Sequence, residues 1–230
     1  MIQLAVFDMA GTTVVDNNFV AQAFCKSFEQ HTILISEETV NPLMGYPKPI
    51  AIQMVLEHQG QEADKELVDA IHATFVEEML DFYEYAPEVK PMPGAEALFL
   101  FLKEKGVKVA LNTGFSRNIA GVIVARFQWQ ERGLVDEYIG SDEVAEGRPS
   151  ADMINALKKR LRIGAEAEVM KVGDTVVDIL EGKTAGCTYT IAVTTGAATK
   201  EELEPFQPTH IIHDLSQIEA LFRESLQPIV

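Results

Sequence analysis

Residues 5–14, AVFDMAGTTV, place one aspartate at the end of an apolar run and follow it with small and hydroxyl residues. The run IQLAVFD (2–8) has the continuous apolar character of a strand buried on both faces of a sheet. Asp8 then stands at the carboxyl end of this strand, and Ala10 stands two places later, where a second carboxylate would fit. The chemistry of the protein therefore depends on what else reaches this strand end.

Further apolar runs, each bounded by turn residues, resemble the first. They are VKVALNT (107–113), EYIGS (137–141), VMKVGD (169–174), YTIAVTT (189–195) and, as an expected edge strand, HIIHD (210–214). Helical patterns lie between them, at 94–106, 150–161 and 175–186. This alternation predicts an α/β fold with a doubly wound parallel sheet. In such sheets ligands bind beyond the carboxyl ends of the strands.

The interval 16–88 breaks this rhythm, since it has no comparable strand pattern. It carries helical patterns at 17–31, 49–60 and 65–85, and PEVKPMPG, rich in proline, then returns the chain to the sheet. We therefore predict two units: a core made of residues 1–15 plus 89–230, and a helical cap domain at 16–88 inserted after the first strand.

Composition limits the partners. The chain has 230 residues, of which 47% are hydrophobic and 23% charged, so we expect a sizeable buried core. A net charge of -16 argues against nucleic acid or an anionic membrane as partner, and an anionic substrate would need a local cation or a metal. Cys25 and Cys187 lie far apart, and neither a signal peptide nor a membrane span is expected, so we predict a cytoplasmic protein.

Polar groups follow several of the predicted strands. Each alone has an ordinary explanation, because an aspartate after a strand is often a helix N-cap and an arginine before proline is often a solvated loop residue. Together at one edge of a parallel sheet, they favour a shared site. The candidates are Asp8, then Asn112, Thr113 and Gly114, then Arg148, and finally Asp174 with Asp178 one helical turn beyond it.

These side chains suit phosphoryl transfer. Asp8 and Asp174 offer the oxygen ligands that Mg²⁺ prefers, and Asp8 can also attack phosphorus to form an aspartyl phosphate. Thr113 and the amides around Gly114 can donate to phosphoryl oxygens. Arg148 can hold two such oxygens through its planar fork.

The motifs DMAGT, NTG, GRPSADM and VGDTVVD, in this order over essentially the whole chain, resemble the four motifs of the haloacid dehalogenase superfamily. The resemblance implies a Rossmann-like core with a helical type-1 cap. It also implies Mg²⁺ held by Asp8, Asp174 and the Ala10 carbonyl, with Asp178 in support. By the same resemblance the substrate-binding residues are Thr12, Asn112, Gly114, Met44 and Gly45.

Ala10 departs from most phosphatases of this superfamily, which read D-x-D at the first motif and use the second aspartate as acid and base. Such catalysis is worth about 10²–10⁴-fold. DxAGT together with Arg148 resembles instead the phosphonatase-like branch, the family of phosphonoacetaldehyde hydrolase. That branch cleaves a carbon–phosphorus bond with a cap lysine, which forms an imine with the substrate carbonyl so that the leaving group departs as an enamine.

Lys48 occupies the place of this lysine, in an M-G-x-x-K stretch that begins with Met44 and Gly45. Pro49 is a typical first-turn residue, so Lys48 is expected at a helix N-terminus, where the helix end and a closed cleft should lower the pKa of its amine. The alternative is that Lys48 only orients a substrate anion.

Two positions differ from the phosphonatase pattern. Ala51 stands where that branch has a histidine, and Phe115 stands where it has a tyrosine. The difference favours a relative that acts on another 2-oxoalkylphosphonate. Nearby polar residues that could replace the missing groups are Asp16, Asn17, Asn18 and Tyr46.

Three functions remain open from the sequence. The first is a Mg²⁺-dependent phosphonatase-like hydrolase, the second a phosphomonoesterase on a small phosphorylated metabolite, and the third a phosphometabolite-binding protein without turnover. The resemblance also implies a homodimer paired through the cap, for which the amphipathic segment 17–31 is the candidate contact.

Overall fold

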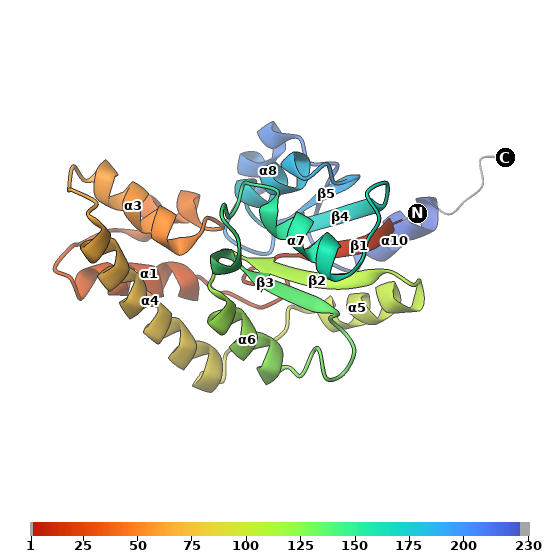
Figure 1. Ribbon diagram of the computed structural model, residues 1–230, viewed down its shortest axis with the longest axis horizontal. Helices are drawn as coiled ribbons and strands as arrows, with labels where there is room; N and C mark the ends of the chain where they lie inside the picture. The colour runs from red at the N-terminus through yellow and green to blue at the C-terminus, as the bar shows by residue number, and fades with distance from the viewer. Residues whose placement is uncertain (1, 226–230) are drawn as a thin grey trace.

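A six-stranded sheet forms the centre of the computed structural model, which describes residues 2–225 (Figure 1). Its strands are β1 (Ile2–Phe7), β2 (Lys108–Thr113), β3 (Glu137–Gly140), β4 (Glu168–Gly173), β5 (Tyr189–Val193) and β6 (His210–Ile212). They are all parallel, in the order β3-β2-β1-β4-β5-β6. The predicted parallel α/β sheet is confirmed, and the last strand lies at an edge as expected.

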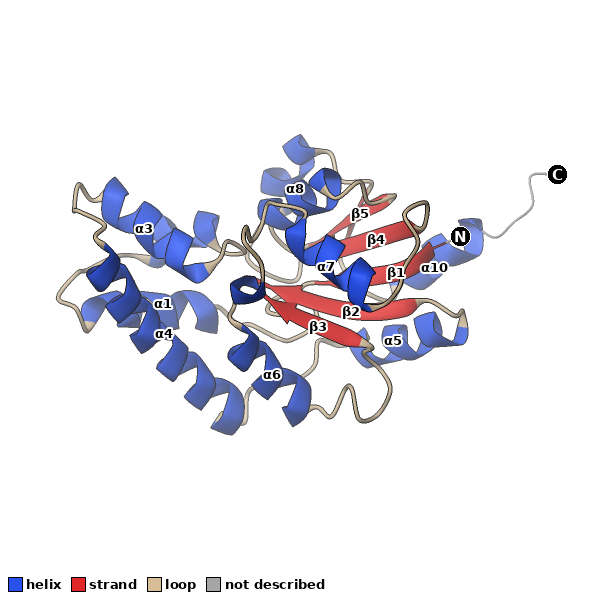
Figure 2. Cartoon of the chain, in the orientation of Figure 1, coloured by secondary structure: helices blue, strands red, loops and turns tan. Residues whose placement is uncertain are grey.

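Helices cover both faces of this sheet (Figure 2). They are α5 (Ala95–Glu104), α6 (Arg117–Arg126), α7 (Asp152–Arg160), α8 (Val176–Thr184), α9 (Lys200–Leu203) and α10 (Gln217–Ser225), with the 3-10 turns η2 (Ser141–Glu143) and η3 (Glu204–Phe206). The helices expected at 94–106, 150–161 and 175–186 correspond to α5, α7 and α8. Helix α6, which sequence analysis did not assign, carries buried Ile119 and Ile123 on one side.

Side-chain alternation along the central strand explains the two layers. Ala5 and Phe7 of β1 face the hydrophobic cluster that includes α5 and α6, whereas Leu4 and Val6 face the cluster that includes α7. The ring of Phe7 packs edge-on against Phe99 of α5, with centroids 5.4 Å apart. Because β1 is buried on both faces, the residue that follows it is held in a fixed place.

We call residues 16–88 the cap. Among them lie α1 (Phe19–Glu29), α2 (Glu37–Val40), the 3-10 turn η1 (Asn41–Leu43), α3 (Lys48–His58) and α4 (Lys65–Tyr85), grouped beside the carboxyl ends of the strands (Figure 1). Helix α4 has the bounds predicted for it. Its first turn is capped by the Asp64 side chain, which accepts a hydrogen bond from the Leu67 amide. Its buried residues, every fourth along the helix, are Ile71, Phe75, Met79 and Tyr83.

The cap is joined to the core by two segments that lie side by side. The Val15 amide donates to the Lys90 carbonyl (3.0 Å), and the Met92 amide donates to the Thr13 carbonyl (2.8 Å). Val14 and Pro91 form an antiparallel bridge between them. The outgoing and returning chains therefore cross from core to cap at one place.

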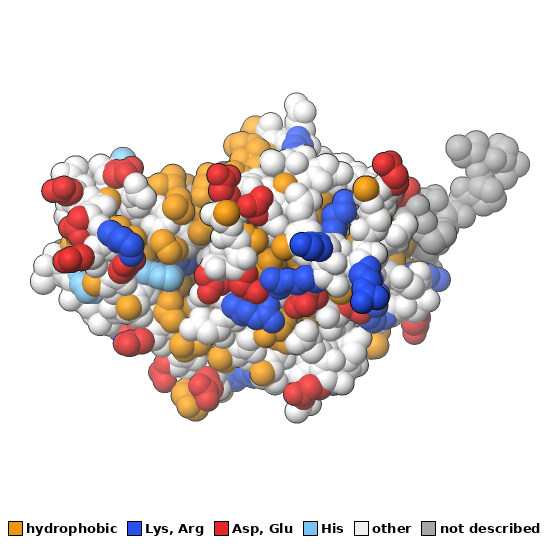
Figure 3. Space-filling view, in the orientation of Figure 1, with side chains coloured by type: hydrophobic (Ala, Val, Ile, Leu, Met, Phe, Trp, Pro, Cys, Tyr) orange, Lys and Arg blue, Asp and Glu red, His pale blue; other side chains and the backbone are white. Residues whose placement is uncertain are grey.

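The surface of the protein carries many acidic side chains, as expected from the net charge of -16. On the face seen in Figure 3, acidic side chains are spread over both the cap and the core. No helix within residues 2–225 combines the length and the apolar character needed to cross a membrane.

Candidate active site

Three adjacent strands bring polar side chains to one edge of the sheet. Asp8 follows β1, Thr113 ends β2 and Asp174 follows β4, and β1 lies between the other two strands. A cavity with an empty volume of about 360 Å³, part of it open to solvent, lies at this edge beneath the cap. Eight of the twelve residues predicted from the sequence line it: Asp8, Ala10, Met44, Gly45, Lys48, Thr113, Gly114 and Asp174.

Arg148 holds the carboxylate of Asp8. Its Nη1 donates to Asp8 Oδ1 over 2.6 Å, and both side chains are almost fully buried. Burial raises the pKa of Asp8 to about 6, although the charge of Arg148 opposes this. Within residues 2–225 the second oxygen, Oδ2, accepts no hydrogen bond, so it is the oxygen that can attack a bound phosphorus.

The remaining donors of Arg148 also meet protein groups. Nη2 donates to the backbone oxygen and to Oδ1 of Asn112, both over 2.7 Å. Nη1 lies 3.0 Å from Asp178, and Nε lies 3.2 Å from Glu181. The guanidinium group thus contacts protein groups on every side. Binding of a phosphoryl group by Arg148 stays a prediction, and it would require a phosphoryl oxygen to replace at least one of these contacts.

Lys171 and Glu181 complete this buried network, and sequence analysis missed both. Lys171 Nζ lies 2.9 Å from Asp178 and 3.1 Å from Glu181, and it donates to Asn112 Oδ1 over 2.6 Å. Glu181 accepts a hydrogen bond from Asn112 Nδ2 over 2.7 Å. The sequence holds one signal for each residue. Lys171 is a lysine inside an apolar strand, and Glu181 follows Asp178 by one helical turn, on the helix face that packs on the sheet.

Asn112 and Thr12 lie outside the cavity lining. The side chain of Asn112 is buried and directed at Arg148, Lys171 and Glu181, so in this structure it positions charged groups. Thr12 is also fully buried, and its hydroxyl donates to Asp174 Oδ1 over 2.8 Å. A substrate contact by either residue stays a prediction.

Asp174 faces Asp8 across the cavity. Its Oδ2 accepts a hydrogen bond from the Ala197 amide over 2.8 Å. Burial and the negative charges of Asp8 and Asp178 raise its pKa well above the usual range. The chain comes close here because Gly11 has a positive φ of 80°, and a Cβ at that position would lie 2.6 Å from Asp174 Oδ2.

The donor set at this point fits a divalent cation. Two buried carboxylates that repel each other are stabilised by a positive ion, and hard oxygen donors suit Mg²⁺. Residues 2–225 contain no cluster of three or more His, Cys, Asp and Glu side chains in a metal-binding arrangement. A backbone ligand is available beside these carboxylates, because Ala10 lines the same cavity and no donor within the described chain hydrogen-bonds its carbonyl oxygen.

Asp178 lies outside the cavity lining and contacts the residues that hold the site. It forms a capping box with Thr175 at the start of α8, in which its Oδ2 accepts from the Thr175 hydroxyl over 2.6 Å. Burial would raise its pKa, but the charges of Arg148 and Lys171 outweigh burial and hold the pKa below its usual value. Asp178 is thus a fixed negative charge between two cations.

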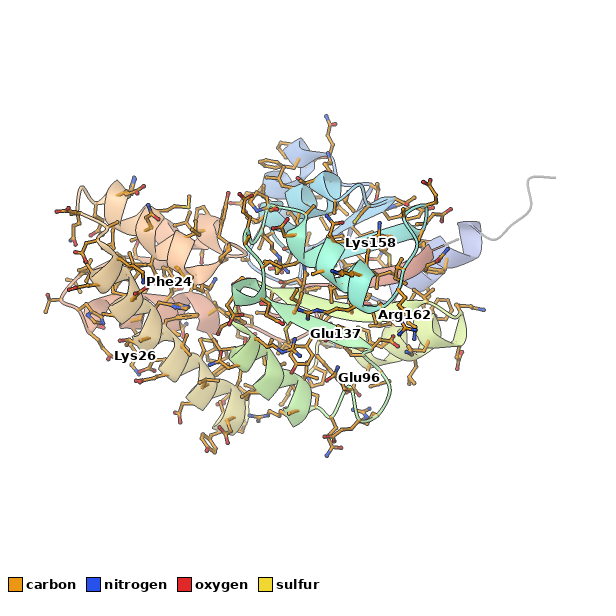
Figure 4. All side chains as sticks on the ribbon, in the orientation of Figure 1. Phe24, Lys26, Glu96, Glu137, Lys158 and Arg162 are labelled. Atoms are coloured by element: carbon orange, nitrogen blue, oxygen red, sulfur yellow. The ribbon has the colours of Figure 1, made fainter. Side chains whose placement is uncertain are left out.

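Lys48 enters the cavity from the cap. It is the first residue of α3 and is only 3% exposed. Its Nζ lies 3.9 Å from Met44 Sδ and 5.6–6.0 Å from the ring centroids of three phenylalanines, Phe24 of α1 (labelled in Figure 4), Phe75 and Phe115. No described carboxylate lies within 4.0 Å of this amine. Burial lowers the pKa of Lys48 to about 8, against the opposing charges of Asp8 and Asp16.

Glycines allow the cap to close on the core. A Cβ on Gly114, in the loop after β2, would lie 2.5 Å from the Tyr46 carbonyl oxygen of the cap. A Cβ on Gly45, which has a φ of 93°, would lie 2.5 Å from the Thr175 hydroxyl oxygen. The backbone of these two loops therefore lies directly against the opposite wall of the cavity, where a side chain would not fit.

Fold and site together define a class: hydrolases with a parallel sheet, a strand-end aspartate and a helical insertion above it. A family model for haloacid dehalogenase-like hydrolases matches residues 2–186, and the chain belongs to this family. Among curated relatives, the phosphonoacetaldehyde hydrolase of Bacillus mycoides is 26% identical over 97% of this chain and 89% of its own length.

Solved structures share the fold. A phosphonoacetaldehyde hydrolase-like protein from Oleispira antarctica superposes with a TM-score of 0.84 at 22% identity, covering 97% of this chain and 92% of that one. A protein from Haemophilus somnus described as a predicted phosphoglycolate phosphatase superposes with a TM-score of 0.77 at 18% identity, covering 96% and 98%. At these identities the likeness concerns the fold alone.

Proposed function

We propose that this hydrolase is a phosphonatase-like enzyme that cleaves the carbon–phosphorus bond of a 2-oxoalkylphosphonate, phosphonoacetaldehyde or a relative of it. The observation that carries the proposal is the environment of Lys48. Lys48 has no carboxylate partner within residues 2–225, is buried among aromatic rings and has a pKa near 8. Such a lysine supplies the neutral amine that attacks a carbonyl. The similarity to the Bacillus enzyme supports the same reaction.

In the proposed reaction Lys48 activates the substrate carbonyl and Asp8 attacks the phosphorus. The Lys48 amine adds to the substrate carbonyl and, after loss of water, becomes a protonated imine. Asp8 Oδ2 then attacks phosphorus, the carbon–phosphorus bond breaks, and its electron pair passes into the imine to give an enamine. Water later hydrolyses both the aspartyl phosphate and the imine. Ala10 is tolerated because the imine activates the leaving carbon in place of an acid at that position.

A cation and the strand-end donors complete the site. Asp8, Asp174 and the Ala10 carbonyl are the proposed ligands of Mg²⁺, which when bound offsets the negative charge of the phosphoryl group. Thr113 and Gly114 line the same cavity, and in this proposal the Thr113 hydroxyl and the Gly114 amide donate to phosphoryl oxygens. Arg148 keeps Asp8 oriented for attack.

A phosphomonoesterase is the second candidate, because structures of the same fold include one described as a predicted phosphoglycolate phosphatase. In that function Lys48 would only attract a substrate anion. Borohydride added with phosphonoacetaldehyde or 2-oxopropylphosphonate separates the two, since it reduces an imine to a stable amine.

We expect mass spectrometry to find the substrate's carbon skeleton on Lys48, and no adduct on the Lys48→Ala protein. Lys48→Arg should be as inactive as Lys48→Ala, because a guanidinium keeps the charge but forms no imine here. Partial rescue by Lys48→Arg, with no adduct on the unmodified protein, would establish the orienting role and exclude the imine. Phosphate binding without turnover of any phosphonate or ester would favour a binding protein.

A further inference from the structure

Asp16 is an ionisable group of the cavity that the proposed steps do not use. Four ionisable side chains line the cavity, and three of them, Asp8, Asp174 and Lys48, already have roles. Asp16 is the fourth. It lies in the loop between β1 and α1, where the cap begins, and its side chain is half-buried.

One oxygen of Asp16 is tied to the backbone. Oδ1 accepts a hydrogen bond from the Val20 amide over 3.0 Å, which fixes the side chain against the first turn of α1. Within residues 2–225 the carboxyl group makes no hydrogen bond or ion pair with another side chain. The group is therefore held at the first turn of α1 and is available to a molecule in the cavity that it lines.

The charged and titratable groups around Asp16 come from three elements. Lys48 faces it from α3, Asp8 from the end of β1, and Tyr83 from α4. Burial raises the pKa of Asp16 to about 6, against the lowering effects of the Val20 amide and of Lys48. Burial and the charges of Asp16 and Asp8 raise the pKa of Tyr83 well above 10, so the tyrosine stays neutral. A carboxyl group in this range can both give and accept a proton near neutral pH.

We propose that Asp16 is the acid and base that serves Lys48 in forming and hydrolysing the imine. This inference rests on the proposed imine reaction. When the Lys48 amine adds to the carbonyl carbon, the carbonyl oxygen becomes a hydroxyl group. The Asp16 carboxylic acid gives its proton to that hydroxyl, the carbon–oxygen bond breaks, water leaves, and the nitrogen lone pair completes the protonated imine. Asp16 remains as a carboxylate.

The reverse transfer closes the cycle. After the carbon–phosphorus bond has broken, the enamine carbon takes a proton from solvent water and the protonated imine forms again. A water molecule then attacks the imine carbon and gives one proton to the Asp16 carboxylate. The carbon–nitrogen bond breaks as the remaining hydroxyl proton passes to the nitrogen, which releases the product carbonyl and the Lys48 amine. Asp16 thus supplies at the cap the proton transfer for the imine that Ala51 cannot supply.

Asp16→Asn tests this role, because the asparagine oxygen can still accept from the Val20 amide and preserve the start of α1. We would compare kcat/KM for 2-oxopropylphosphonate in the two proteins between pH 5 and 9. Below pH 6 the variant should be at least about 10²-fold slower. Above pH 6 the ratio should shrink by about tenfold per pH unit as Asp16 of the native enzyme loses its proton. Ionisation of the substrate cancels in this ratio.

Two further variants complete the test. Asp16→Glu keeps a carboxylic acid and should retain the pH dependence of the native enzyme. Asp81→Asn, the same change on an exposed residue of α4, should give a ratio of one at every pH. If the native enzyme forms the Lys48 adduct but the Asp16→Asn ratio is near one, or is constant with pH, the role of Asp16 is refuted and the imine reaction stands. If the native enzyme forms no adduct, both proposals fail.

Discussion

Replacing Lys48 by methionine should stabilise the protein while it destroys the proposed reaction. Methionine is close to lysine in length and suits the surroundings of this side chain, which are Met44 and three phenylalanine rings. The ammonium group of Lys48, by contrast, is removed from water and has no ion-pair partner within residues 2–225. The buried charge of Lys48 therefore lowers the free energy of unfolding of the protein.

The pKa of Lys48 sets the size of that cost. The value falls from 10.5 to about 8, and one pKa unit corresponds to about 1.4 kcal/mol, so burial of the charge costs about 3 kcal/mol at neutral pH. Below pH 8 the lysine is protonated in both the folded and the unfolded protein, and the full cost is present. Between pH 8 and 10.5 the unfolded chain binds more protons, so the native protein becomes more stable as pH rises.

Urea unfolding at pH 7 and at pH 10 measures this effect. We expect Lys48→Met to raise the free energy of unfolding by up to about 3 kcal/mol at pH 7, and the gain to shrink at pH 10. Lys159→Met, the same change on an exposed residue of α7, is the control and should be near neutral at both pH values. A variant that is no more stable than the native protein, with no dependence on pH, would refute the buried-charge account of Lys48.

Three other substitutions test the core of the site. Asp8→Asn should leave the fold intact and reduce turnover of 2-oxopropylphosphonate far below a tenth, because an amide is a poor nucleophile; retained turnover would remove Asp8 from that role. Arg148→Lys should lower kcat/KM at least about tenfold, since a lysine cannot reach Asp8 and Asn112 together, whereas an unchanged value would make the fork dispensable. Glu181→Gln should lower the free energy of unfolding by about 3 kcal/mol, because Arg148 and Lys171 lose a buried counter-charge; a loss no larger than that of exposed Glu104→Gln would contradict this.

Strand positions could be predicted closely because parallel strands buried on both faces are continuous apolar runs. The same logic placed Asp8, Thr113 and Asp174 at one edge, since parallel strands end together. Short elements such as α2 and α9 could not be predicted in this way. Each has four residues, too few to show a helical period, and depends on a local cap at Ser36 or Thr199.

The sequence pattern can single out Lys171 and Glu181 as unusual residues, but it cannot predict that they contact each other, and the reason is physical. A pattern identifies which face of a strand or helix is polar, but it does not show that two polar faces meet in the interior. Lys171 and Glu181 are separated by ten positions and come together only because α8 packs on β4. The direction of the Asn112 side chain follows from these two residues, so it could not be predicted either.

The paired crossing between core and cap has a consequence for how such a protein can diversify. Val15 and Lys90 are joined by a hydrogen bond, so the chain leaves the sheet and returns to it at almost the same point. The free-energy cost of closing a loop grows only slowly with its length. Recombination could therefore replace the whole cap by one of a different size without changing the path of any strand. Asp8 would keep its place in the core, while Lys48 and Asp16, which both belong to the cap, would be replaced together.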